Sequence, residues 1–261
     1  MILASDSSTR IVSWNLGHQT HLADIHPRFL DAVRALAPDI LVLNEYGHDE
    51  TERAPLVKSL ADADIGLIHH LVSEQIMCPA KTPGGKPLPN NQVSVASRYY
   101  LRRGDLHGPW TADNGGGANF LHVVIDDLSI ELVGMRVPAY GTEALQLYWD
   151  AFSQLANSVI DRKICFIGDF NADPDSARHI AAKRFANFRD HGWHIPKVED
   201  NWSFKSGTRI DHALASSSFP HIAVAQYVDS YDDLTLAGST HDAIFDHAAL
   251  VIDLASKGVG R

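Results

Sequence analysis

The stretch Lys163-Ile-Cys-Phe-Ile-Gly-Asp-Phe-Asn-Ala-Asp-Pro-Asp175 passes from an apolar segment through a glycine into a polar turn. A short apolar run that ends in glycine and Asp-Pro predicts a buried strand leaving a sheet. Asp169 and Asn171 follow two residues apart, so in extended chain they would share one orientation. A carboxylate there can bind a metal or a water while an amide donates to a phosphate oxygen. An ordinary turn with a helix cap is the alternative interpretation.

The rest of the chain alternates between predicted strands and helices. We expect strands at 10–15, 40–43, 65–72, 92–96, 120–126, 129–138, 163–167, 210–215, 222–228 and 248–254. We expect helices at 27–36, 142–160 and 176–188. Many strands with several intervening helices favour the α/β class, with two sheets packed face to face and helices outside. No boundary divides the chain, so we expect a single domain, 1–261.

Composition restricts the function more than the fold. The 261 residues are 45% hydrophobic and 21% charged, which is ordinary for a globular protein. The net charge of −10 disfavours tight DNA binding by counterion release alone. It permits an enzyme that handles phosphates at one point, where a divalent cation supplies positive charge. Without a leader pattern or a long apolar run, we expect a cytoplasmic protein with no membrane partner.

Several predicted strands end in polar side chains that a buried strand does not need. They are Asn15, Glu45, Asp169, Asn171, Asp211, Asp246 and His247. Each has an ordinary explanation when taken alone: Asn15 as a turn former, Glu45 as the first solvated residue after a strand, His247 as a core histidine. Strand ends in one sheet region can converge on one cleft, so the set together indicates an active site.

Six segments, in order along the chain, resemble the endonuclease/exonuclease/phosphatase superfamily. They are Ser13-Trp14-Asn15, Leu43-Asn44-Glu45, Val93 to Arg98, Gly168-Asp169-Phe170-Asn171, Thr208 to Leu214 and Asp246-His247. The resemblance implies a four-layered α/β sandwich, with two packed mixed sheets flanked by helices. It also implies Mg²⁺, with Mn²⁺ as a possible substitute, near Glu45, and Asn15 and Asp246 as further ligands or orienting residues. Hard oxygen ligands suit both ions.

The resemblance further implies a hydrogen-bonded pair of Asp211 and His247, and in-line attack of water on phosphorus. Asp169 or His247 would deprotonate the water, and the sequence does not decide between them. Asn171 and His247 would donate to the phosphate oxygens. Arg136 stands where relatives often have His or Tyr, and its guanidinium can hold two phosphate oxygens; a surface ion pair is the alternative. Arg98 is a second candidate for phosphate contact.

The leading prediction is a metal-dependent phosphodiesterase, most simply a nuclease acting on DNA or RNA. Other basic or aromatic candidates for substrate contact are Lys81, Lys86, Arg102, Arg103, Lys205, Arg209, Trp202 and Phe204. One alternative is an enzyme for a small phosphorylated metabolite or lipid head group, which needs no extended basic track. Another is a non-catalytic binding module that keeps only the fold. DNA against RNA, endo against exo action and oligomeric state all stay open.

Overall fold

The computed structural model describes residues 8–17, 25–47, 50–78, 88–89, 91–109, 117–138, 142–176, 182–198 and 202–255. Within these residues the chain forms two large mixed sheets, two short hairpin-like pairs and four α-helices. The short pairs are β4 (Met77–Cys78) with β5 (Leu88–Pro89), and β13 (Ser230–Tyr231) with β14 (Leu234–Thr235). The two large sheets carry the residues that matter for function.

The first sheet has six strands in the order β12-β15-β1-β2-β6-β3. They span Ile222–Val228 (β12), Ala249–Leu254 (β15), Thr9–Asn15 (β1), Ile40–Tyr46 (β2), Gln92–Ser97 (β6) and His69–Val72 (β3). β1 and β2 run parallel, and β15 pairs antiparallel with β1. The carboxyl ends of β1 and β2 therefore lie at the same edge as the amino end of β15. Three polar segments predicted to be functional meet there.

The second sheet has five strands in the order β11-β10-β9-β8-β7. They span Asp211–Ala215 (β11), Ile164–Asp169 (β10), Ile130–Arg136 (β9), Phe120–Ile125 (β8) and Arg102–Arg103 (β7); a 3₁₀ turn, η1 (Asp126–Leu128), joins β8 to β9. β10 is parallel to β9 and antiparallel to β11, and the register aligns Asp169 with both Arg136 and Asp211. One row across this sheet thus holds three of the predicted site residues.

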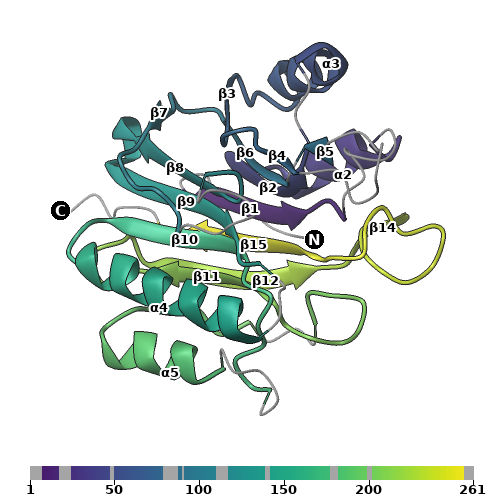
Figure 1. Ribbon diagram of the computed structural model, residues 1–261. Helices are drawn as coiled ribbons and strands as arrows, with labels where there is room; N and C mark the ends of the chain where they lie inside the picture. Colours follow the sequence, from purple (N-terminus) through teal and green to yellow (C-terminus); the bar gives the residue numbers. More distant parts are fainter. Residues whose placement is uncertain are drawn as a thin grey trace.

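The sheets pack face to face and the helices cover their outer faces (Figure 1). Helices α2 (Phe29–Leu36) and α3 (Glu50–Ala61) lie over the first sheet, and α4 (Thr142–Ser158) and α5 (Ala182–Asp190) lie over the second. Alternate strand residues such as Val42, Val95 and Leu132 fill the space between the sheets. The predicted α/β class and four-layered sandwich are confirmed.

Helix α4 shows why the outer layers hold. Its Tyr148, Trp149, Phe152 and Ala156 recur at helical spacing, and all four are buried. The Phe152 ring packs edge-on against Phe166 of β10, with centroids 5.2 Å apart. Burying one such side chain stabilises the fold by about 1.5–3 kcal/mol. The packing keeps β10, and with it the polar turn that follows, in a fixed position.

The structure differs from the sequence predictions most clearly at three elements. The strand expected at 65–72 begins only at His69, because Gly66 adopts φ +77° and 62–66 form a turn. Helix α3 was not predicted, since Pro55 stands inside it and its apolar residues are not strongly periodic. The helix expected at 176–188 is α5, and residues 177–181 lie outside the described part of the chain.

Candidate functional site

Two hydrogen bonds join the sheets at the edge where the predicted site residues lie. Asn15 Nδ2, at the end of β1, donates to Asp169 Oδ2, at the end of β10, over 3.0 Å. His247 Nδ1, two residues before β15, lies 2.9 Å from Asp211 Oδ2, at the start of β11. Since Asp169 and Asp211 are paired in the strand register, the two contacts stand side by side. The strand ends of both sheets thus form one site.

Asp169 is held by hydrogen bonds on both carboxylate oxygens. The backbone N–H of Asn171 donates to Oδ1 over 2.8 Å, and Asn171 Nδ2 donates to Oδ2 over 3.1 Å. Asn171 Nδ2 also donates to the Val137 carbonyl over 2.7 Å. Asn171 has φ +48°, so the expectation of a shared orientation in extended chain was wrong. A left-handed turn brings the two side chains into contact instead.

Gly168 is required by this turn. Its φ of +145° lies in a region that side chains disfavour, and a Cβ at this position would stand 2.0 Å from the Met135 carbonyl oxygen. Only glycine lets β10 pass so close to β9 at the point where Asp169 leaves the sheet. The glycine at the end of the apolar run is therefore part of how the site is positioned.

The Asp211–His247 pair is buried and supported from three sides. Tyr227 Oη donates to the Asp211 carbonyl over 2.6 Å, and Ser203 Oγ accepts from the Asp211 N–H over 3.1 Å. Trp14 Nε1 donates to the His247 carbonyl over 2.8 Å. Tyr227 and Ser203 were not singled out from the sequence, because neither lies in a strand-end motif. Only the folded chain places them beside Asp211.

Burial and charge shift two pKa values in this site. The pKa of Asp169 is raised to about 7, first by burial and then by the Asp211 charge, against the opposing effects of His247 and Arg136. Burial alone would lower the pKa of His247, but the charge and hydrogen bond of Asp211 outweigh it and raise the pKa to about 9. At neutral pH the site therefore pairs a protonated imidazole with a carboxyl group close to its titration point.

A third contact between the sheets is an ion pair. Glu45 Oε1, on β2, lies 2.7 Å from Arg136 Nε, at the end of β9, and the two side chains are only 7% and 15% exposed. Arg136 Nε is also 3.6 Å from Asp169 Oδ2. Glu45 has φ +53°, a left-handed conformation that non-glycine residues rarely adopt and that is typical of functional positions. Arg136 thus contacts two of the predicted site carboxylates.

Asp246 completes the acidic side of the site. Its Oδ2 lies 3.2 Å from Lys205 Nζ, whereas its Oδ1 is buried without a hydrogen-bond partner in the described structure. A Cβ on Gly17 would stand 2.8 Å from that Oδ1, which places Asp246 against the turn after Asn15. A buried carboxylate oxygen without a hydrogen-bond donor is suited to a divalent cation, and the carboxylate of Glu45 could offer a further hard oxygen ligand. Asn15, whose amide is bound to Asp169 and the Gly17 N–H, serves as an orienting residue.

Several of the other residues predicted to contact the substrate lie away from this site. Arg98 pairs with Asp39 across 3.6 Å. Asp39 precedes β2, and Glu45 lies at the other end of that strand, so at ~3.3 Å per residue Arg98 is about 20 Å from Glu45. Arg102 and Arg103 lie on β7, the outermost strand of the second sheet. Phe204 does approach the site, with its ring centroid 4.8 Å from that of His247. Trp202 packs against the core between the sheets, and Lys81 and Lys86 lie outside the described residues.

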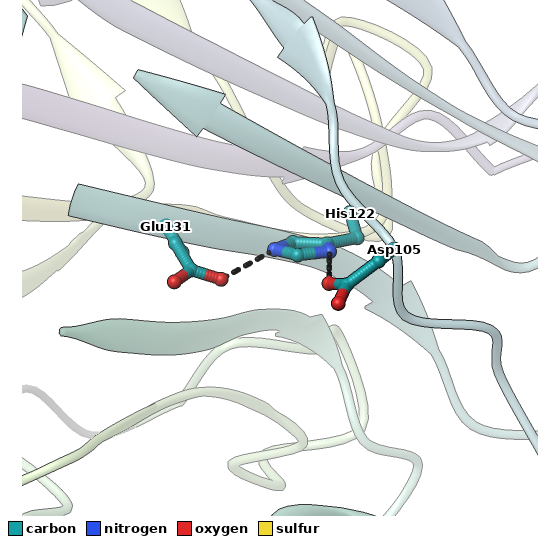
Figure 2. Close-up of side chains that lie close together, drawn as sticks. All are labelled: Asp105, His122 and Glu131. Atoms are coloured by element: carbon teal, nitrogen blue, oxygen red, sulfur yellow. Dashed lines mark hydrogen bonds and ion pairs between the residues drawn. The ribbon is translucent and has the colours of Figure 1, made fainter. Parts of the chain in front are cut away.

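A second group of potential metal ligands lies at the opposite end of β9 from Arg136. Asp105 and Glu131 approach the two ring nitrogens of His122 (Figure 2). His122 Nδ1 accepts from the Leu106 N–H over 3.1 Å, Nε2 lies 2.9 Å from Glu131 Oε2, and burial lowers the pKa of the ring. Arg162 binds both carboxylates. The ligand atoms are thus already satisfied, and we interpret this group as a structural ion-pair network.

The chain matches the Endonuclease/Exonuclease/phosphatase family over residues 12–241. No curated protein sequence matches it. Among solved structures, an endonuclease/exonuclease/phosphatase from Beutenbergia cavernae DSM 12333 aligns with a TM-score of 0.67 at 19% identity, covering 97% of this chain and 72% of that one. The Neisseria 3′ phosphatase NExo, bound to a product DNA hairpin, aligns with a TM-score of 0.64 at 16% identity, covering 95% and 99%. The human Nocturnin catalytic domain, with a bound sulfate, gives 0.62 at 15%, covering 96% and 95%. At these identities the structures establish the fold alone.

Proposed function

This chain belongs to the endonuclease/exonuclease/phosphatase family, and we propose that it is a metal-dependent phosphodiesterase acting on nucleic acid. The observation that carries the proposal is the alignment of Asp169 with the buried Asp211–His247 pair, in one row of the second sheet. A carboxyl group near its titration point beside a charged imidazole is the combination that general acid–base chemistry at neutral pH requires.

Asp169 is the residue we assign as the general base. Its pKa of about 7 lets it accept a proton from water near neutral pH, and Asn15 and Asn171 fix the direction of its carboxylate. Asp211 raises the pKa of His247 to about 9, so at that pH the imidazole carries its proton and suits the role of donor. With Nδ1 held by Asp211, its Nε2–H is available to donate to a phosphoryl oxygen.

Asn171 takes a different role from the one its sequence position suggests. An amide carries two N–H groups, and both are used here, by the Val137 carbonyl and by Asp169. We therefore assign Asn171 to positioning Asp169 rather than to holding the phosphate. Phosphate contact then falls to His247 and Arg136, since the guanidinium can bind two oxygens at once.

Glu45 and Asp246 are the residues that would hold a divalent cation. The partnerless Oδ1 of Asp246 is the structural feature that supports this assignment, and the oxygen donors suit Mg²⁺ or Mn²⁺. A bound cation would neutralise negative charge that builds on the phosphoryl and leaving oxygens. It would also supply positive charge at one point of a chain whose net charge of −10 works against any polyanionic substrate.

A substrate panel tests the proposal. Single-stranded DNA, duplex DNA, RNA, lipid and inositol phosphates would be incubated with Mg²⁺ or Mn²⁺, with Asp169→Ala as the inactive control. We expect hydrolysis of a nucleic acid that chelator and the substitution both abolish. Hydrolysis in excess chelator, or undiminished hydrolysis by Asp169→Ala, would contradict the proposal.

A small phosphorylated metabolite or lipid head group is the second candidate substrate. The net charge favours it, because a small substrate needs no extended basic track, and Arg98, Arg102 and Arg103 lie away from the site. Salt dependence separates the candidates. An enzyme that binds several phosphates of a nucleic acid should lose affinity steeply as salt rises, whereas a small-molecule enzyme should not. A non-catalytic module would show neither turnover nor stabilisation by metal.

A further inference from the structure

Each of the two carboxylates assigned to the metal is paired with a side-chain cation of the protein itself. Arg136 pairs with Glu45, and Lys205 pairs with Asp246. The two cations come from different places, since Arg136 ends β9 and Lys205 lies in the loop before β11. The Glu45–Arg136 pair also joins the two sheets, but both pairs place a positive side chain directly on a carboxylate assigned to the metal.

The Arg136 contact is the tighter of the two. Its guanidinium lies 2.7 Å from Glu45 and 3.6 Å from Asp169, and both Glu45 and Asp169 are almost fully buried. Arginine remains charged at all ordinary pH values, so this cation cannot be removed by deprotonation. A divalent cation bound at Glu45 would take over this positive charge, so the buried carboxylate would stay compensated when the guanidinium leaves.

Lys205 is held more loosely. Its backbone N–H donates to the Asp246 carbonyl over 3.0 Å, which fixes the chain, while its side chain is 44% exposed. Nζ lies 3.2 Å from Asp246 Oδ2 and 5.8 Å from the Phe204 ring centroid. The exposed ammonium is therefore free to leave Asp246, and it lies on the side of the Phe204 ring, which in turn packs against His247.

We propose that Arg136 and Lys205 are internal counter-ions that a divalent cation displaces, and that the displaced side chains then bind the phosphate of the substrate. Metal and phosphate binding would thereby be coupled, since each makes the other more favourable. The proposal rests on the metal assignment above and adds to it a specific role for two residues of this chain. By thermodynamic linkage, phosphate must tighten metal binding by the same factor that metal tightens phosphate binding.

Arg136→Gln should bind the metal more tightly than the wild type. Removing the competing cation takes a positive charge away from Glu45, so Mn²⁺ should bind more tightly than in the wild type. A coupling free energy of ordinary size corresponds to a change of about 5- to 150-fold in the dissociation constant. A substitution that merely loosened the site would weaken metal binding instead. Methyl phosphate should tighten Mn²⁺ binding to the wild type and have a much smaller effect in Arg136→Gln.

Isothermal titration with Mn²⁺, with and without methyl phosphate, provides the measurement. Arg98→Gln is the matched control, because it removes the same charge at the far end of β2 and should leave the Mn²⁺ affinity unchanged. Arg136→Lys should restore weaker metal binding, since it returns the cation. If Arg136→Gln does not fold, Lys205→Gln decides, because its side chain is half exposed and it should also bind Mn²⁺ more tightly.

Equal or weaker Mn²⁺ binding by the folded Arg136→Gln protein would overturn the proposal, as would the same result for Lys205→Gln if only that variant folds. These titrations need no turnover, so they separate the two claims. A protein that hydrolyses no phosphodiester yet shows the coupling would refute the proposed function alone. A protein that hydrolyses nucleic acid without the coupling would refute only the displacement of Arg136 and Lys205.

Discussion

Asp211→Asn should lower the pKa of His247 by more than two pH units. In the wild type this pKa is about 9, although burial of the ring acts to lower it, and Asp211 makes the largest contribution to the increase, ahead of Asp169 and Asp246. Relative to the usual histidine pKa of 6.5, the increase is worth on the order of 3 kcal/mol, at ~1.36 kcal/mol per pH unit. Without the Asp211 charge, burial is opposed only by the smaller effects of Asp169 and Asp246, so the pKa of His247 should fall to about its usual value of 6.5 or below. The pKa of Asp169 should fall too, because Asp211 is the largest charge that raises it.

The assay combines histidine NMR titration with the pH dependence of kcat/KM. The wild type should give a bell-shaped profile that rises near pH 7 as Asp169 ionises and falls near pH 9 as His247 loses its proton. Both limbs should move to lower pH in Asp211→Asn. His247→Gln identifies the resonance among the 15 histidines. A His247 pKa that stays near 9 in Asp211→Asn would refute the reasoning.

The free energy of unfolding should also depend on pH through the Asp211–His247 pair. A histidine whose pKa is higher folded than unfolded adds stability that is fully present below about pH 6.5 and lost as pH rises through about 9. The difference in unfolding free energy between wild type and Asp211→Asn should therefore shrink across that interval. Urea denaturation at pH 6 and pH 9.5 measures it, and a difference that grew with pH would contradict the pairing.

Three substitutions test the fold that holds the site. Gly168→Ala should lower the free energy of unfolding by at least about 3 kcal/mol in urea denaturation, since its Cβ would stand 2.0 Å from the Met135 carbonyl at a strained φ. A loss under about 1 kcal/mol would show that β10 relaxes easily. Asp253→Ala should cost about 3–5 kcal/mol, because it leaves the buried Arg10 unpaired. Trp149→Ala should lower the free energy of unfolding by about 3–5 kcal/mol through the cavity it opens, and a near-neutral result would place α4 outside the core.

The strands were the most predictable part of the fold. The apolar runs before Asn15, Glu45 and Asp169 are short, β-branched and bounded by turn residues, so the local pattern defines them. β10 nevertheless extends past its predicted end at 167 through Asp169. Glycine normally weakens a strand, but here Gly168 continues the pairing because the neighbouring backbone comes so close.

The candidate site was only partly predictable. Strand ends indicated Asn15, Glu45, Asp169, Asp211 and His247, because a parallel or antiparallel register brings such ends to one edge. Sequence order says nothing about cross-sheet pairs such as Glu45 with Arg136, which depend on how the sheets pack. Ser203 and Tyr227 carry no motif at all, and their contacts with Asp211 span 8 and 16 residues of irregular chain and strand.

Arg98 shows the limit of reading motifs without geometry. It follows an apolar strand, as the site residues do, but β6 runs antiparallel to β2, so the end of β6 lies at the other edge of the sheet.

Among the described residues, none of the helices combines the length and the apolar character that a membrane span requires. The predicted single domain and the cytoplasmic location stay predictions.

The central claim is that Asp169 activates water in a metal-dependent phosphodiesterase. Its most direct test is single-turnover hydrolysis of a generic phosphodiester by wild type and Asp169→Asn, each with Mg²⁺ and with excess chelator. We expect turnover only by the wild type with Mg²⁺, and a loss of about 10²- to 10⁴-fold in Asp169→Asn, the usual contribution of a general base. A wild-type rate that is unchanged in excess chelator would contradict this role of the metal. An Asp169→Asn rate within about threefold of the wild-type rate would contradict the role of Asp169, because a general base contributes more than that.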